Sequence, residues 1–286
     1  MEFVTLNTGA KMPLEGFGVF QIPDAAQCEQ AVYEAIRMGY RLIDTAAAYF
    51  NEAAVGKAVK RAIADGLVKR DELFITTKVW VSDMKTEAAA YEAVKVSLKK
   101  LQMDYADLIL LHQPMSDYFA AYRGIVKAYQ EGLTKAVGVA NFYPAILANF
   151  CETVEVIPAV NQVELHPYFV QQEAVDTMKK YGVVPQAWGP LAEGRHGIFT
   201  DAELVAIGKK YGKTAAQVAL RWNVQRGVSI IPKSVHVERM EQNLAIWDFV
   251  LTEEEMQVIA AKDLGHSEIV DHSSPEFVKF IHNYHI

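Results

Sequence analysis

The chain has 286 residues, of which 51% are apolar and 22% charged, and its formal net charge is −7. This length suits either two ordinary domains or one α/β barrel of about 250 residues. Sequence-independent binding of nucleic acid would need a local basic patch that overcomes the overall negative electrostatic potential of the protein. The lysine pairs at 99–100, 179–180 and 209–210 each lie near the carboxyl end of a helix-like segment, where cations interact favourably with the helix dipole. The composition therefore argues against a nucleic-acid partner.

The amino-terminal and cysteine patterns indicate a cytoplasmic protein. Residues 1–13 lack the basic start and continuous apolar stretch of a secretory signal, and no run approaches the roughly 18 apolar residues of a membrane span. Cys28 and Cys151 lie in helix-like segments without CxxC spacing, as in reduced intracellular proteins. No HExxH motif is present, and we expect no metal site and no membrane association.

The predicted elements begin with a hairpin in residues 1–15, where Asn7, Thr8 and Gly9 supply the turn. Strand-like runs then alternate with amphipathic helical stretches nearly to the end of the chain. The predicted strands are 16–21, 40–46, 73–80, 106–113, 135–142, 159–166, 184–191 and 228–234, with helical patterns that include 25–39, 53–66, 86–101 and 120–132. Residues 265–286 resemble a tail rather than a further repeat.

Eight strand–helix units predict a parallel barrel whose strands are apolar on both faces. An open doubly wound sheet is the alternative, but its GxGxxG motif fails because Gln21 follows Gly16 and Gly18 where the third glycine belongs. No linker rich in Pro, Gly or Ser interrupts the chain. We therefore predict an α/β fold made of one (β/α)8 TIM barrel over residues 1–286, with an amino-terminal β-hairpin and a carboxyl-terminal tail.

Polar side chains follow the predicted strands at the end where a β/α barrel carries its active site. The residues at these strand ends are Asp44, Lys78, His112, Asn141, Gln162 with Glu164, Trp188 and Lys233. One such residue can be accidental, but seven strands that each carry one predict a single polar mouth.

Four ionisable residues suggest proton transfer: Asp44, Tyr49, Lys78 and His112. A free tyrosine titrates near ~10, and an ammonium ~4 Å away at an effective dielectric of ~20 is worth about 4 kcal/mol, or roughly three pKa units before Asp44 offsets part of it. We therefore expect Lys78 to bring the pKa of Tyr49 toward neutrality. A neutral His112 would orient a substrate carbonyl without adding charge. Taken singly, each of the four also has an ordinary structural explanation, such as a loop cap, packing or a surface amine.

At this point the chain resembles the aldo-keto reductase family. The resemblance rests on DTAAAY (44–49), TTKVW (76–80), LLHQP (110–114), GVANF (138–142), NQVELHP (161–167) and IPKSVHVERMEQN (231–243). It is greatest to short-loop bacterial members such as the diketogluconate reductase group. It implies an NADPH-dependent carbonyl reductase with Tyr49 as proton donor and Asp44, Lys78 and His112 in support. Fold precedent points to a monomer.

The resemblance also implies a set of NADPH contacts. The residues implied are Lys233, Ser234 and Arg239 at the 2′-phosphate, Gln242 and Asn243 at the adenine, Asn141 and Gln162 at the carboxamide, Trp188 against the nicotinamide ring, and Val235 and Gly189 as further cofactor residues. We also expect the loop 191–199, with Leu191 and Glu193, to fold over the pyrophosphate. A basic helix start is the alternative for the segment at 233, and a flexible surface loop is the alternative for 191–199. The chain departs from the family pattern at Ala140, Gly189 and His236.

For the substrate, we expect Phe20, Trp80, His112 and Gln113 to line an apolar pocket with one polar handle. The family often has Trp where Gln113 stands, which favours a polar carbonyl compound such as a sugar-derived or keto-acid carbonyl. Two other functions are open on the same barrel: a Schiff-base lyase with Lys78 as nucleophile, and a regulatory subunit that binds NADPH without turnover.

Overall fold

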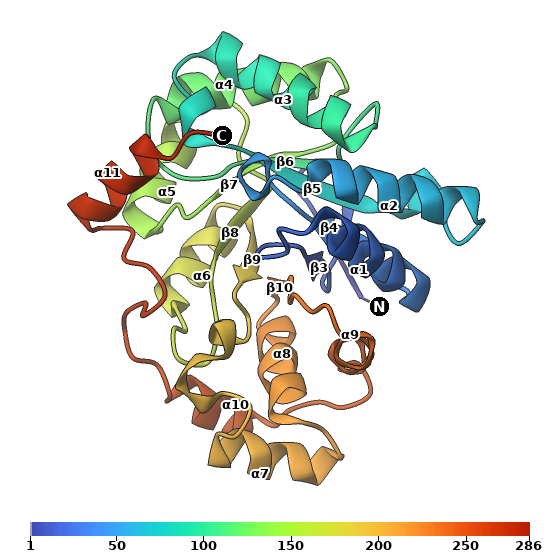
Figure 1. The fold of residues 1–286 in the computed structure, drawn as a ribbon. Coiled ribbons are helices and arrows are strands. Elements are labelled where there is room, and N and C mark those ends of the chain that lie inside the picture. The colour runs from blue at the N-terminus through green and yellow to red at the C-terminus, as the bar shows by residue number, and fades with distance from the viewer. Residues whose placement is uncertain (1) are drawn as a thin grey trace.

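The protein, here as a computed structural model that describes residues 2–286, is a closed parallel barrel (Figure 1). Its strands follow one another in chain order: β3 (Phe17–Gly18), β4 (Leu42–Asp44), β5 (Phe74–Val79), β6 (Leu108–Leu111), β7 (Val137–Ala140), β8 (Val160–Glu164), β9 (Val184–Trp188) and β10 (Ser229–Ile230). Backbone hydrogen bonds from Gly16 N to Ile230 O and from Gly18 N to Pro232 O join the first strand to the last. The predicted (β/α)8 fold is confirmed.

Helices surround the barrel because each strand is buried on both faces and needs an outer cover (Figure 1). They are α1 (Ala25–Met38), α2 (Glu52–Ala64), α3 (Glu87–Leu101), α4 (Tyr118–Gln130), α5 (Pro144–Thr153), α6 (Gln172–Lys180), α7 (Ala202–Tyr211), α8 (Ala215–Gln225) and α9 (Val237–Leu244). Side-chain caps at Asp24, Thr86 and Thr214 satisfy the first amides of α1, α3 and α8. Two further helices, α10 (Glu253–Ala260) and α11 (Pro275–Asn283), follow the barrel.

The hairpin closes the amino-terminal end of the barrel. Strands β1 (Phe3–Thr5) and β2 (Lys11–Pro13) pair in antiparallel fashion, and Gly9 takes a positive φ of 85° in the turn between them. Leu6 and Met12 are buried and join the apolar cluster inside the barrel. In the part of the chain that the structure describes, no helix is long and apolar enough to cross a membrane.

A buried carboxyl group lies at this closed end. Glu15 is fully buried, and only one of its oxygens has a partner among the described residues, the indole Nε1–H of Trp247 at 2.8 Å. Burial raises the pKa of Glu15 to about 8, although the Trp247 hydrogen bond opposes the shift. Glu15 is therefore mainly protonated in the folded protein at pH 7, whereas it would be ionised in the unfolded chain.

This difference predicts a loss of stability between the two pKa values. Because the folded state binds the extra proton, the free energy of unfolding should fall as pH rises from about 4.5 to about 8, by an amount on the order of 5 kcal/mol for this one group. Glu15→Gln keeps an acceptor for Trp247 and removes the titration, so the variant should gain stability over the parent as pH rises through this window. Urea denaturation at pH 4.5, 6 and 8 measures the difference.

The exposed Glu241 of α9 provides the matched control, since Glu241→Gln should shift stability little at any of these pH values. A Glu15→Gln variant whose stability relative to the parent is the same at all three pH values would contradict the raised pKa.

Candidate active site

The centre of the site is a buried ammonium group with three oxygen partners. Lys78, the fifth residue of β5, donates from Nζ to Asp44 Oδ1 at 2.6 Å, to the Thr45 carbonyl at 2.9 Å and to Tyr49 Oη at 3.3 Å. Lys78 is completely buried, and each of its three N–H groups has one partner. Since Lys78 donates to the phenol oxygen, the phenol's own proton is left free for a group in the cavity.

Local structure places Tyr49 at the mouth of the barrel. A short 3₁₀ helix, Ala47–Tyr49, follows β4 and ends where Phe50 takes a left-handed conformation at φ 56°. Asn51 then fastens the loop: its Oδ1 accepts from Thr45 Oγ1, and its Nδ2 donates to the Val19 and Ile22 carbonyls. The loops after β3 and β4 are thus tied together beside the phenol.

A chain of hydrogen bonds connects this ion pair through the barrel interior to the hairpin. Gln162 Nε2 donates to Asp44 Oδ2 and to Gln186 Oε1, both at 2.8 Å. Gln186 Nε2 donates to Ser229 Oγ at 3.1 Å, and Ser229 donates to the Pro13 carbonyl of the hairpin. Both N–H groups of Gln162 are used below the mouth, and its Oε1 makes no hydrogen bond to a residue of the described chain. That oxygen is an acceptor available at the cavity.

The prediction that the pKa of Tyr49 falls toward neutrality is wrong in its net direction. Burial raises the pKa of Tyr49, the Lys78 charge lowers it, and the Asp44 carboxylate raises it again, with the result that the pKa lies above the ordinary value. Lys78 donates a hydrogen bond to the phenol, as expected, but the negative charge of Asp44 offsets the effect of its positive charge on Tyr49. Burial also acts to lower the pKa of Lys78, yet Asp44 and Tyr49 more than compensate, so the pKa of Lys78 is raised and the ammonium persists.

His112 is held neutral beside the phenol. It follows β6, and its ring lies 5.6 Å from the Tyr49 ring and 4.9 Å from the Trp80 ring, both in edge contacts. Burial, assisted by the positive charge of Lys78, lowers the pKa of His112 well below its ordinary value. A neutral imidazole at pH 7 agrees with the expectation from the sequence.

These groups open into one cavity of about 730 Å³ at the carboxyl ends of the strands. Most of the predicted site residues lie in its wall: Asp44, Tyr49 and His112 of the proton-transfer set, Phe20, Trp80 and Gln113 of the substrate set, and Asn141, Gln162, Trp188, Gly189, Leu191, Glu193, Lys233 and Arg239 of the cofactor set. Lys78 lies behind Tyr49 and Asp44, out of the wall.

One end of the cavity has the properties of an anion site. Lys233 is exposed to it from the segment that leads into α9 and Arg239 from the first turn of α9, and neither forms an ion pair within the described chain. Two unpaired cations beside the first turn of a helix fit a phosphate group. Across the cavity, Trp188 Nε1 donates to Asn141 Oδ1 at 2.8 Å, and Asn141 Nδ2 donates to the His112 carbonyl.

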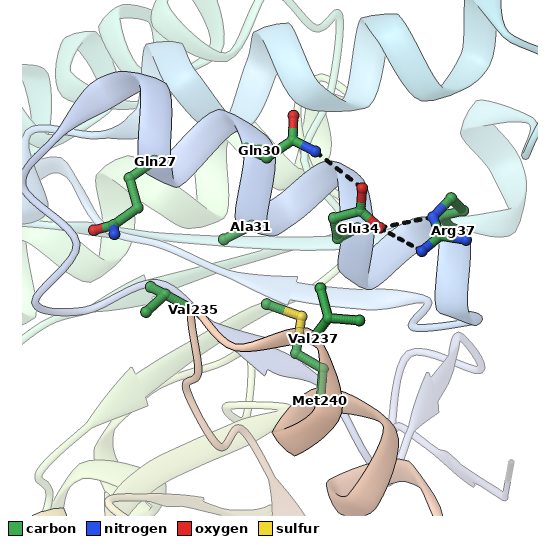
Figure 2. Close-up of a pocket in the computed structure, with 8 residues that line it drawn as sticks. All are labelled: Gln27, Gln30, Ala31, Glu34, Arg37, Val235, Val237 and Met240. Carbon is green, nitrogen blue, oxygen red and sulfur yellow. Dashed lines mark hydrogen bonds and ion pairs between the residues drawn. The ribbon is translucent and has the colours of Figure 1, made fainter.

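Four predicted cofactor residues lie outside this cavity wall. Ser234 is buried in a turn, where its Oγ accepts from His236 N, and Asn243 is buried in α9 beside the exposed Gln242. Val235 lines a separate hollow of about 360 Å³ between α1 and the start of α9 (Figure 2). Three polar side chains of that hollow pair with one another, Gln30 and Arg37 with Glu34.

The carboxyl-terminal tail forms a part of the wall that the sequence analysis left unassigned. It contributes Ile269, Val270, His272, Phe277, Phe280, Ile281 and Tyr284. Contacts that fasten it include hydrogen bonds from Ser267 Oγ to Glu164 Oε2, between His272 Nδ1 and Tyr143 Oη, and from Trp80 Nε1 to the Tyr284 carbonyl. The spacing of 277, 280, 281 and 284 is one face of a helix, and this signal identifies the segment in retrospect.

Comparison with known proteins places the chain in a family. The family model described as aldo/keto reductase matches residues 16–264. The chain belongs to the aldo/keto reductase family. This reductase is thus an oxidoreductase of carbonyl compounds that uses NADPH, and the predicted family, enzyme class and cofactor are confirmed.

Its relatives include bacterial enzymes and solved structures. The reductase is 41% identical to methylglyoxal reductase DkgA of Salmonella typhimurium over 265 residues, covering 92% of this chain and 94% of the relative. It is 42% identical to glyoxal reductase of Bacillus subtilis, with 90% and 91% covered. A Bombyx mori aldo-keto reductase solved in complex with NADP has a TM-score of 0.90 at 34% identity and covers 94% of this chain and 95% of its own.

Substituting one partner of the Lys78–Asp44 pair should reduce stability far more than substituting both partners. Lys78→Met leaves the Asp44 carboxylate buried without its cation and should reduce stability by about 3–5 kcal/mol, whereas the double variant Lys78→Met with Asp44→Asn should recover most of this loss. Urea denaturation of the parent, both single variants and the double variant measures the coupling.

Lys95 and Glu92 form an exposed ion pair on α3 and serve as the control. Lys95→Met should change stability by less than about 1 kcal/mol. A Lys78→Met variant that loses no more than this control would show that the buried pair has no special energetic role.

Proposed function

We propose that Tyr49 is the proton donor in the reduction of an aldehyde or ketone carbonyl by this reductase. The observation that carries the proposal is the Lys78 Nζ to Tyr49 Oη hydrogen bond at 3.3 Å, made at the wall of the cavity into which His112 also faces. The raised pKa of Tyr49 keeps the phenol protonated before the reaction. An alkoxide is a stronger base than a phenolate, so proton transfer from the phenol becomes favourable once negative charge develops on the carbonyl oxygen.

The neighbouring residues prepare this transfer. His112, neutral and beside Tyr49, can hydrogen-bond the carbonyl oxygen and orient it without competing for the proton. Lys78 stabilises the phenolate that remains after the transfer, because its ammonium already donates to the phenol oxygen. Asp44 keeps Lys78 charged and in place through the 2.6 Å ion pair.

The cofactor fits the remaining groups of the cavity. NADPH supplies the hydride when bound. Lys233 and Arg239 would hold its 2′-phosphate, and Gln162, whose Oε1 is available, would accept from the carboxamide together with Asn141. Trp188 offers a ring surface at the same end of the strands, and Leu191 and Glu193 belong to the segment that would cover the pyrophosphate.

The same geometry argues against the two other functions considered. Lys78 is completely buried with all three N–H groups engaged, and its pKa is raised, so its nitrogen has no free lone pair with which to attack a carbonyl. A purely regulatory role, in which NADPH binds without turnover, does not require the arrangement of tyrosine, lysine and histidine at the cavity. The expected monomeric state and cytoplasmic location stay predictions.

Removal of the phenol hydroxyl should abolish turnover and leave cofactor binding intact. Tyr49→Phe preserves the ring packing against Phe20 and His112, so the NADPH dissociation constant should hardly change, while kcat should fall by about 10²- to 10⁴-fold. Loss of absorbance of the reduced nicotinamide with a panel of aldehydes and ketones measures kcat, and fluorescence titration measures binding. Tyr129→Phe on α4 is the control, and near-normal kcat in Tyr49→Phe would remove Tyr49 from the role.

Removal of the Lys233 cation should discriminate between the two nicotinamide cofactors. Lys233→Ala should weaken NADPH binding by about ten- to a hundredfold through the lost phosphate contact, and NADH binding by much less. Titration of parent and variant with both cofactors checks this, with the exposed lysine of Lys209→Ala as the control. Equal losses for NADPH and NADH would argue against a 2′-phosphate contact at Lys233.

A further inference from the structure

Three polar side chains lie on adjacent strands in the barrel interior, which in this fold is usually filled by branched apolar residues (Figure 1). They are Gln162 of β8, Gln186 of β9 and Ser229 of β10, and together they are named the interior ladder. Gln186 is the direct register partner of both Gln162 and Ser229. Gln186 and Ser229 are fully buried and lie outside the wall of the site cavity, whereas Gln162 lies in that wall. Buried polar groups cost stability unless they are paired, so such a ladder needs partners at both of its ends.

The groups at the two ends of the interior ladder accept hydrogen bonds and cannot donate them. At one end, Gln162 Nε2 lies 2.8 Å from Asp44 Oδ2. At the other end, Ser229 Oγ lies 3.3 Å from the Pro13 carbonyl of the hairpin. A carboxylate and a backbone carbonyl are both acceptors only. Ser229 therefore uses its one proton on Pro13, and Gln162 uses an N–H on Asp44.

This requirement fixes the orientation of both amides. Since the Ser229 proton is used, Ser229 Oγ accepts from Gln186 Nε2 at 3.1 Å, and Gln186 turns its Oε1 toward Gln162. Gln162 then donates its second N–H to Gln186 Oε1 at 2.8 Å. With both N–H groups used inside the barrel, Gln162 Oε1 is the part of the amide left for the cavity. Reversing Gln162 would set its oxygen against the Asp44 carboxylate and, through Gln186, would take the Ser229 proton from Pro13.

Gln186 supplies a constraint that Asp44 alone does not provide. A planar amide held through one N–H can pivot about that bond, whereas bonds from both N–H groups to acceptors in different directions fix its plane. Gln186 reaches Gln162 from the neighbouring strand β9, and Asp44 reaches it from β4, which is not adjacent to β8 in the sheet. The position of Gln162 Oε1 at the cavity therefore depends on a residue that does not line the cavity.

We propose that the interior ladder positions the cofactor: Gln186 and Ser229 orient Gln162 so that its Oε1 accepts from the carboxamide N–H of the nicotinamide. This inference rests on the proposed contact between Gln162 and the carboxamide. It extends the determinants of cofactor binding to two residues outside the cavity wall and, through Pro13, to the hairpin at the closed end of the barrel. Gln186 and Ser229 act through Gln162 and are positioning residues.

A cofactor analogue without the carboxamide N–H tests the interior ladder. 3-Acetylpyridine adenine dinucleotide phosphate keeps the carbonyl on the pyridine ring of NADP+ and has a methyl group in place of the NH2 group. Isothermal titration calorimetry gives the dissociation constants of both compounds for the parent, Gln186→Met, Ser229→Ala and Gln162→Leu. The ratio of the analogue's constant to that of NADP+ measures recognition of the N–H, and it requires no turnover.

We expect the parent to bind NADP+ about five- to thirtyfold more tightly than the analogue, because the analogue sets a methyl group against Gln162 Oε1. Gln186→Met should lower this ratio by about three- to tenfold through weaker binding of NADP+, with the analogue within about twofold of the parent. Ser229→Ala removes the acceptor of Gln186 Nε2 and should lower the ratio in the same direction. Gln186→Leu is measured in parallel, so a folding defect specific to the methionine side chain does not decide the outcome.

Two control variants separate positioning from general damage to the protein. Gln257→Met makes the same exchange at an exposed position of α10. Ile125→Ala truncates a fully buried side chain of α4 that does not line the cavity. Ile125→Ala should lower the midpoint of urea denaturation, and both controls should keep the parent's ratio of dissociation constants.

The outcomes distinguish the ladder from the contact on which it rests. A ratio that Gln162→Leu lowers, but that Gln186→Met and Ser229→Ala leave unchanged, would overturn the ladder and keep the proposed carboxamide contact. Equal weakening of NADP+ and the analogue in Gln186→Met would overturn the ladder as well. A ratio unaffected by Gln162→Leu would contradict the contact and the ladder together. Since only binding is measured, none of these outcomes depends on proton donation by Tyr49.

Discussion

The buried ion pair between Lys78 and Asp44 is the constraint on which the mouth of the barrel depends. A cation that is completely buried requires a full set of acceptors, and the strands provide them: a carboxylate from the end of β4, a carbonyl from the next residue and the phenol of the following 3₁₀ turn. Asp44 in turn requires Gln162, which continues through Gln186 and Ser229 to the hairpin. The polar groups of six chain segments are therefore satisfied together, and the phenol is held by an arrangement that spans the barrel from one end to the other.

This arrangement changes what the lysine does for the tyrosine. An isolated ammonium at hydrogen-bond distance would lower the pKa of a phenol, but here Asp44 lies closer to the ammonium than Tyr49 does and cancels much of its charge. Burial then dominates, and the phenol holds its proton more tightly than tyrosine in water does. In the proposed proton transfer, the contribution of Lys78 is therefore to stabilise the product and to orient the donor. Its hydrogen bond occupies the phenol oxygen from behind and directs the phenol proton toward the cavity.

The fold and the strand-end residues were predictable because they depend on local periodicity. Alternating strand and helix patterns specify the barrel, and a barrel brings the carboxyl ends of its strands to one face, which makes Asp44, Lys78 and His112 neighbours. The net pKa of Tyr49 was not predictable from spacing, because it is a balance of burial against two opposite charges. The tail was missed for a different reason: its contacts with Glu164, Tyr143 and Trp80 span 100 residues or more, and no local pattern indicates which strand ends a terminal helix will cover.

The two ends of the cavity differ in charge, and this difference favours a different kind of ligand at each end. Exposed, unpaired cations at Lys233 and Arg239 suit an anionic phosphate, whose affinity comes from charge and falls with added salt. The end at Trp80, His112 and Gln113 has only aromatic surface and neutral hydrogen-bonding groups, so a ligand there is selected by shape and by pairing of dipoles. A dinucleotide phosphate bound at the cationic end gains nothing from entering the neutral end. A neutral carbonyl compound gains nothing from the cations. In the proposed reaction, cofactor and substrate would therefore share one continuous cavity without competing, and Tyr49 lies in the wall of that cavity.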